Sequence, residues 1–298
     1  MKPLQSGSIT VRRIVEIERV LFEPTAIFRN ATPELVERNK AWLDERFIDG
    51  PTGQLVLGMH SYLVQTRSHN ILVDTGNGNL KRRRNAWQHN QRTAYLQNLA
   101  ALGLRPTDID VVLCTHLHSD HVGWNTTLSN GQWVPTFPRA AYLFGAEEFD
   151  GLNRKHYQAN AAEPVIGGAF LDSVLPIIDA RLAQLVEMDH VIEQDGDDGV
   201  WLEAMPGHTP GQVAVHVKQG AFHVVLASDV LHHPIQLAEP DLVVNFDDDP
   251  QEALATRRRL LQTYTDTNTI ILPAHFPTPS ASRIIAWGDH YRFRLIER

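Results

Sequence analysis

The stretch "CTHLHSDHVGW", residues 114–124, places three histidines and one aspartate between His116 and His121, directly after an apolar run. In an extended segment residues two apart share a face, so His116 and His118 can reach one ion together. Asp120 and His121 follow where the chain turns, and they can serve a second ion beside the first. Imidazole and carboxylate suit Zn²⁺ and similar metals, and the lack of a thiolate cluster argues against a closed structural zinc site.

Three further positions share this setting at the end of an apolar run. "PGHTPG" carries His208, "VVLASD" ends on Asp229, and "IILPAH" ends on His275. A single aspartate or histidine at such a position is more often a capping or surface residue. Their shared setting favours a joint interpretation as metal ligands that meet at the ends of strands.

The rest of the chain alternates β-rich runs with amphipathic segments. "HSYLVQT" and "NILVDTG" predict a hairpin, and further strands are expected in "DIDVVLCT", "AAYLFG" and the runs that precede the three isolated candidates. This alternation predicts an α/β layered sandwich. Three helices are expected: residues 32–47 with Thr32 as N-cap, residues 92–103 with Gly103 as stop, and residues 249–264 with Asp249 as N-cap.

The overall composition is that of a globular protein, and it gives no electrostatic reason to expect a polyanionic partner. The chain has 298 residues, 43% hydrophobic and 21% charged, with a net charge of −8. We expect a single domain over residues 1–298, in which residues 1–50 form an N-terminal extension that packs on the core. Neither a nucleic acid nor a membrane partner is expected, because the balance is acidic and the apolar runs are strand-sized. The single cysteine, Cys114, predicts core packing and fits a reducing, cytoplasmic location.

The ligand pattern resembles the metallo-β-lactamase superfamily of metallohydrolases, from roughly Leu57 to Phe293. This resemblance implies a four-layer αββα sandwich with a dinuclear site in a cleft between two sheets. It implies two divalent ions, zinc first, with Mn, Fe or Co as alternatives. It also implies that Asp74 in "ILVDTG" orients a ligand histidine. The implied ligands are His116, His118 and His208 for one ion, Asp120, His121 and His275 for the other, and Asp229 as a bridge.

Two such ions, about 3.5–4 Å apart, can share a water and lower its pKa toward ~7. Asp120 can accept the proton of this water and pass it to the leaving group, so it is the expected catalytic residue. Residues 123–145 and 228–237 resemble a subgroup that holds YtnP-like lactonases and methyl parathion hydrolases. The resemblance implies hydrolysis of a small lactone or ester, of the quorum-quenching type. The alternative is an organophosphate triester or an aryl ester.

Two residues outside the ligand set are expected near the substrate or behind the ligands. His232 lies three residues after Asp229, where acyl-homoserine lactonases carry a tyrosine. Trp87 follows the basic run Lys81–Arg84 and can cap the cleft, whereas the run itself is expected as a solvated face.

Other classes of protein fit the sequence less well. An RNA-processing nuclease is disfavoured by the acidic balance, a non-catalytic binding protein by the complete ligand set, and a diiron redox protein by the absence of a visible flavin partner domain. A homodimer is expected on base rate alone.

Overall fold

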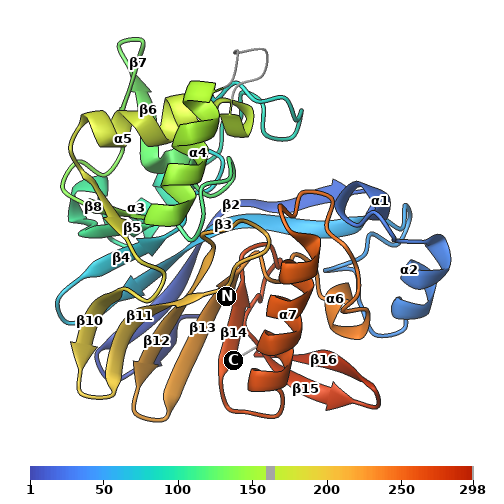
Figure 1. Cartoon of the computed structure of the whole chain (residues 1–298). Helices are drawn as coiled ribbons and strands as arrows, with labels where there is room; N and C mark the ends of the chain where they lie inside the picture. The colour runs from blue at the N-terminus through green and yellow to red at the C-terminus, as the bar shows by residue number, and fades with distance from the viewer. Residues whose placement is uncertain (159–164, 297–298) are drawn as a thin grey trace. The chain divides into compact units, whose positions relative to one another are not determined.

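The computed structural model describes residues 1–158 and 165–296, which form two large sheets and a small two-stranded sheet (Figure 1). The chain divides into two compact units. The His116 unit comprises residues 3–17 and 60–188, and the His208 unit comprises residues 1–2, 18–59 and 189–298. The assignment of a single domain with an N-terminal extension stays a prediction. Strands β2 (Ile9–Phe22) and β3 (Leu55–Gln65) both run from one unit into the other.

The first large sheet has the order β1-β2-β3-β4-β5-β8-β9. Strands β3 and β4 form the predicted antiparallel hairpin, with Gln65 opposite Asn70. Strands β4, β5, β8 and β9 are parallel neighbours, so their carboxyl ends lie at one edge of the sheet. The bounds are β1 (Leu4–Ser6), β4 (Asn70–Val73), β5 (Val111–Leu113), β8 (Ala141–Gly145) and β9 (Ala183–Val186).

Helices and aromatic side chains build the core of the His116 unit. Helix α4 (Ala146–Gln158) contacts β8 and β9 (Figure 1). Buried Tyr95, on helix α3, stacks on Trp124 with a centroid distance of 5.3 Å. The remaining elements are α3 (Tyr95–Ala101), α4 (Ala146–Gln158), α5 (Leu175–Asp179), the hairpin β6 (Thr126–Ser129) and β7 (Gln132–Pro135), and short turns of helix at Pro106–Asp108, Gly123–Asn125, Val165–Gly168 and Phe170–Val174.

The second large sheet belongs to the His208 unit and has the order β10-β11-β12-β13-β14-β15-β16. Strands β13 and β14 are parallel, and β12 is antiparallel to both of its neighbours. The carboxyl ends of β11, β13 and β14 therefore share one edge. The bounds are β10 (Val191–Asp195), β11 (Asp198–Ala204), β12 (Val213–Gln219), β13 (Phe222–Ser228), β14 (Ile270–Pro273), β15 (Ser282–Trp287) and β16 (His290–Leu295).

Helix α7 (Pro250–Tyr264) of the same unit contacts β15 and follows the predicted pattern (Figure 1). The carboxylate of Asp249 accepts hydrogen bonds from the backbone N–H groups of Gln251 and Glu252, both at 3.0 Å. This N-cap satisfies two donors that no helical carbonyl can reach. The shorter helices are α1 (Pro24–Ile27), α2 (Pro33–Asn39) and α6 (Ile235–Ala238).

The predicted helix over residues 32–47 is half right. Thr32 caps α2 as expected, by accepting from Leu35 N at 3.2 Å, but the helix ends at Asn39. There the Asn39 side chain accepts from Trp42 Nε1 at 2.7 Å and donates to the Leu35 carbonyl at 2.8 Å. Such local side-chain bonds give the backbone an alternative to continued helix. Helix α3 also begins later than predicted, at Tyr95.

The predicted solvated basic face at Lys81–Arg84 is wrong for two of its members. Lys81 is fully buried and Arg83 is 6% exposed. The ammonium of Lys81 donates to Thr126 Oγ1 at 2.6 Å and lies over the ring of Trp133. Arg83 pairs with Asp172 through two hydrogen bonds of 2.6 and 2.8 Å. These basic side chains are buried beside their partner, Asp172, which lies far along the chain, and local charge patterning cannot reveal such a partner.

Within the described residues, no helix has both the length and the apolar character that a membrane span requires.

Candidate metal centre

In the His116 unit, candidate site residues follow the ends of two parallel strands. Asp74 comes directly after β4, and the histidine motif follows β5, with Val73 opposite Leu113 in the register. The backbone ties these loops together, because Asp74 N donates to the Leu113 carbonyl at 2.8 Å and Thr75 N to the His121 carbonyl at 2.7 Å. The carboxyl edge of the sheet thus sets the position of the motif.

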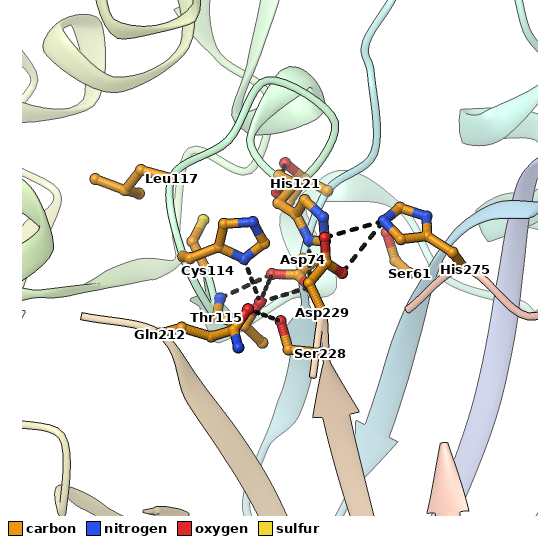
Figure 2. A network of polar contacts seen from close by, with 12 residues as sticks. Ser61, Asp74, Cys114, Thr115, Leu117, His121, Gln212, Ser228, Asp229 and His275 are labelled. Atoms are coloured by element: carbon orange, nitrogen blue, oxygen red, sulfur yellow. Dashed lines mark hydrogen bonds and ion pairs between the residues drawn. The ribbon is translucent and has the colours of Figure 1, made fainter. Parts of the chain in front are cut away.

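Asp74 contacts the motif through its carboxylate, as Figure 2 shows. His121 Nδ1 lies 2.9 Å from Asp74 Oδ2, and Thr115 donates to the same carboxylate from its backbone N–H at 2.8 Å. A carboxylate acceptor keeps the proton on Nδ1 of His121, so Nε2 is left as the atom that can bind a metal. The side chain of Asp74 therefore occupies the place that its predicted orienting role requires.

The four motif residues differ in exposure. His116 and His121 are 1% and 2% exposed, whereas His118 and Asp120 are partly exposed. The ring of His116 lies 4.7 Å from that of His118 and 4.0 Å from that of His121, centroid to centroid. Three imidazoles are thus brought together within one short loop.

Glycine packing holds the loop after β4 against the histidine motif. A Cβ placed on Gly123 would lie 1.9 Å from the carbonyl carbon of Asn77 and 2.4 Å from Gly78 N. Gly123 N also donates to the Gly76 carbonyl at 2.7 Å. Only glycine allows this approach, so "VGW" is part of the motif for a steric reason.

Glu16 is a supporting residue that sequence reasoning missed. Its buried carboxylate accepts from Asn77 N at 2.6 Å, Gly78 N at 3.1 Å and Trp124 Nε1 at 2.7 Å. Burial raises the pKa of Glu16 in spite of these donors. Glu16 thereby ties the glycine turn to the end of the motif, and no local signal marked it, because it lies 61 residues before Asn77.

Trp87 is half-buried, and its neighbour Gln88 donates from Nε2 to Ser119 Oγ of the motif at 3.0 Å. The segment that carries Trp87 is thus attached to the motif, while the capping role of Trp87 itself stays a prediction. Cys114 is 1% exposed, and burial raises the pKa of its thiol well above its usual range. The prediction that Cys114 packs in the core is confirmed.

In the His208 unit, the candidates follow three strands that end at the same edge. His208 lies in the turn after β11, Asp229 follows β13, and His275 follows β14. Ala274 N donates to the Ser228 carbonyl at 3.2 Å, which keeps the last two strand ends adjacent.

The carboxylate of Asp229 is the centre of this group, and Figure 2 shows it joined to His275. Its Oδ2 lies 3.4 Å from His208 Nε2 and 3.2 Å from His275 Nε2. His232 Nε2 lies 3.2 Å from the same oxygen. All four residues are at most 4% exposed. The structure therefore gathers three imidazoles around one buried carboxylate, and one of them belongs to the residue whose role the sequence left open.

The outward nitrogens of two of these histidines are bonded to fixed acceptors. His208 Nδ1 lies 2.9 Å from Asp247 Oδ1, and His275 Nδ1 lies 3.3 Å from the Gly58 carbonyl oxygen. These acceptors direct both Nε2 atoms toward Asp229. Burial raises the pKa of Asp247.

Asp247 was also missed by sequence reasoning. It lies two residues before Asp249, the N-cap of α7. In the sequence alone, the acidic run "FDDDP" is sufficiently explained as the capped start of a helix. The backbone explains its position: Asp248 N donates to the His208 carbonyl at 3.0 Å, which draws the start of α7 to the His208 turn.

The chain belongs to the metallo-beta-lactamase superfamily, whose family model matches residues 56–275. It is a metal-dependent hydrolase of that superfamily, and the α/β fold expected from the sequence is confirmed. The N-acyl homoserine lactonase AiiA of Bacillus thuringiensis subsp. kurstaki is 24% identical over 238 residues, which cover 76% of this chain and 84% of the relative.

Two solved structures share the fold over nearly the whole chain. One is a hydrolase of the beta lactamase superfamily called AbOPH, with a TM-score of 0.78, 20% identity, and coverage of 99% of this chain and 97% of the other. The second is AidC, a dizinc quorum-quenching lactonase in complex with a product, with a TM-score of 0.77, 19% identity, and coverage of 100% and 97%.

Proposed function

We propose that this chain is a dinuclear metal hydrolase that opens lactone rings. The observation that carries the proposal is the surrounding of Asp229, a buried carboxylate approached by the Nε2 atoms of three histidines. Superfamily membership and the likeness to lactonases of similar length support the choice of reaction. A small-molecule substrate follows from the same relatives.

The donor atoms fit divalent zinc, manganese, iron or cobalt. The candidates are imidazole nitrogens and carboxylate oxygens, which all four metals accept. Three of the imidazoles have their second nitrogen tied to a carboxylate or a carbonyl, the arrangement that ligand histidines need. We assign His116, His118 and His208 to one ion, Asp120, His121 and His275 to the other, and Asp229 to both.

When bound by these residues, two divalent ions would supply a nucleophilic water at neutral pH and Lewis-acid polarisation of a substrate carbonyl. The side chains of the chain do the rest. Asp120 is partly exposed, and its carboxylate would accept the proton of the attacking water and return it to the leaving oxygen of the opened ring. Asp74 and Asp247 hold His121 and His208 in one orientation throughout.

The same nucleophile can attack phosphorus, so a phosphotriester or an aryl ester is the alternative substrate class. A substrate panel separates the classes. Wild-type protein with verified metal content is assayed with a long-chain N-acyl homoserine lactone, an aromatic lactone, an aryl ester and an aryl phosphotriester. His118→Ala, which removes a ligand at a partly exposed position, is the inactive control. The proposal predicts the largest kcat/KM for a lactone. A phosphotriester or aryl ester that exceeds every lactone would overturn it.

A further inference from the structure

We propose that His232 is an additional ligand of the ion bound through Asp229, on the side of His208. This inference rests on the proposed function to the extent that an ion binds at Asp229. It adds an eighth residue to the seven expected ligands. His208, Asp229 and His232 each offer one ligand atom, these atoms lie within 4.8 Å of one another, and all three residues are buried.

His232 is held in place from several sides. Its backbone N–H donates to Gln236 Oε1 at 2.7 Å, and its ring lies 4.9 Å from that of His208 and 5.7 Å from that of His275. The ring of Phe246 packs on it at 5.2 Å. The imidazole is therefore confined among the ligands and directed at Asp229.

The two ring nitrogens of His232 carry the argument. Both are buried, and neither has a hydrogen-bond partner among the described residues. Nε2 lies 3.2 Å from Asp229 Oδ2, but without hydrogen-bond geometry. An imidazole lone pair and a carboxylate oxygen that face the same point repel each other unless a cation lies between them. A metal ion at that point satisfies both atoms.

The next residue shows what a structural histidine looks like in the same surroundings. His233 is fully buried, its Nε2 lies 2.8 Å from the Phe47 carbonyl oxygen, and its Nδ1 accepts from Ile235 N at 3.2 Å. The chain thus satisfies one buried histidine with backbone groups and leaves its neighbour aimed at Asp229.

The test measures ion affinity directly. Metal-free wild-type protein, His232→Ala and His232→Gln are titrated with Zn²⁺ against a chromophoric chelator, and the visible absorption of each protein is recorded after Co²⁺ loading. His216→Gln is the matched control, because it removes a buried histidine of the same unit whose nitrogens are bonded to Glu203 and His223. Thermal unfolding of each metal-free variant checks that it is folded. If His232→Ala is not folded, His232→Gln is the variant used for the comparison.

The inference predicts that both His232 variants weaken one of the two ions at least tenfold and change the Co²⁺ spectrum, while His216→Gln does neither. Unchanged ion affinities and an unchanged spectrum would overturn it, including the case in which only KM rises, because His232 would then be a substrate contact. The proposed function fails by a different result, the absence of lactone hydrolysis in wild-type protein that holds two ions.

Discussion

The carboxylate of Asp74 and the Nδ1 atom of His121 lie 2.9 Å apart, both buried, so one orientation of the His121 ring is fixed before any metal binds. Asp74→Asn keeps the shape of the side chain but removes its charge and one of its acceptor oxygens. Loss of such a carboxylate typically weakens metal binding by about 10- to 100-fold. We expect a loss of this size for the ion held by His121, measured by chelator competition.

The control for this prediction is Asp108→Asn, a carboxylate of the same unit that pairs with exposed Arg105. It should leave ion affinity unchanged. Equal affinities for Asp74→Asn and wild-type protein would show that Asp74 only shapes the turn.

In the His208 unit, Asp247 orients a histidine in the same way, because its Oδ1 lies 2.9 Å from His208 Nδ1. Asp247→Asn should weaken the ion held by His208 and leave that held by His121 in place. Asp248→Asn, one residue further and exposed, is the matched control. Metal analysis after dialysis against a weak chelator gives the readout: about one retained ion per chain for Asp247→Asn and two for the control. Two retained ions in both variants would contradict the role of Asp247.

Gly123 is predicted to tolerate no side chain. Gly123→Ala forces a methyl group against the backbone of Asn77, where the space is 1.9 Å, and overpacking of this kind costs about 1–3 kcal/mol or more. Urea unfolding should show that loss. Gly151 lies in α4, and an added methyl there meets no atom within 4 Å beyond its own stretch of helix backbone, so Gly151→Ala should instead raise the free energy of unfolding by about 0.5–1 kcal/mol through helix propensity. Equal free energies of unfolding for the two variants would show that the loop at Asn77 and the loop at Gly123 can move apart at little cost.

Lys81 gives the protein a predictable dependence on pH. Burial lowers the pKa of Lys81 to about 7 in the folded protein, against 10.5 for an ordinary lysine. Between these values the unfolded chain binds a proton that the folded protein does not, so the free energy of unfolding rises with pH, by up to about 1.4 kcal/mol per unit. Below pH 7 both states are charged and this contribution is constant.

The comparison with Lys81→Met isolates this group from other titrating residues. Urea unfolding from pH 7 to 10 should give a steeper rise for wild-type protein than for Lys81→Met. Lys40→Met, at an exposed lysine, should keep the wild-type slope. Asp172 Oδ1 lies 3.5 Å from Lys81 Nζ. Parallel curves for wild-type protein and Lys81→Met would mean that this ion pair keeps Lys81 charged.

Phe246 is an exposed aromatic residue beside the proposed ligands, 42% exposed, with its ring 5.8 Å from that of His208. If lactones are the substrates, Phe246 is placed to contact their apolar substituent. Phe246→Ala should lower kcat/KM about tenfold for a long-chain acyl lactone, which corresponds to roughly 1.4 kcal/mol of lost apolar burial, and much less for a short-chain one. Leu128→Ala, equally exposed at 41% in the β6–β7 sheet, is the control. An equal fall in kcat/KM for long-chain and short-chain lactones would show that Phe246 does not contact the apolar substituent.

Most of what the sequence predicted concerns strand ends. His116, His208, Asp229 and His275 each follow an apolar run, and such runs can be recognised from local composition because buried strands are short and rich in branched residues. The capped helix after Asp249 was predictable for a similar reason, since its cap, its proline and its apolar spacing are adjacent in the chain.

The residues that support the ligands could not be found in this way. Glu16 and Asp247 act on loops that are distant in sequence, and an acidic residue within a strand or before a helix has an ordinary local explanation. The end of α2 at Asn39 was missed because side-chain bonds to Trp42 and Leu35 decide it, not propensity. Burial of Lys81 depends on Asp172, 91 residues later.

The proposed function requires that seven residues hold two ions and that hydrolysis depends on both of them. Metal analysis of stripped and reloaded protein, read together with lactone hydrolysis on the same samples, tests it most directly. We expect two ions per wild-type chain, activity that returns only with the second ion, and fewer than two ions with no activity in His118→Ala. Full activity with one ion or none would contradict it.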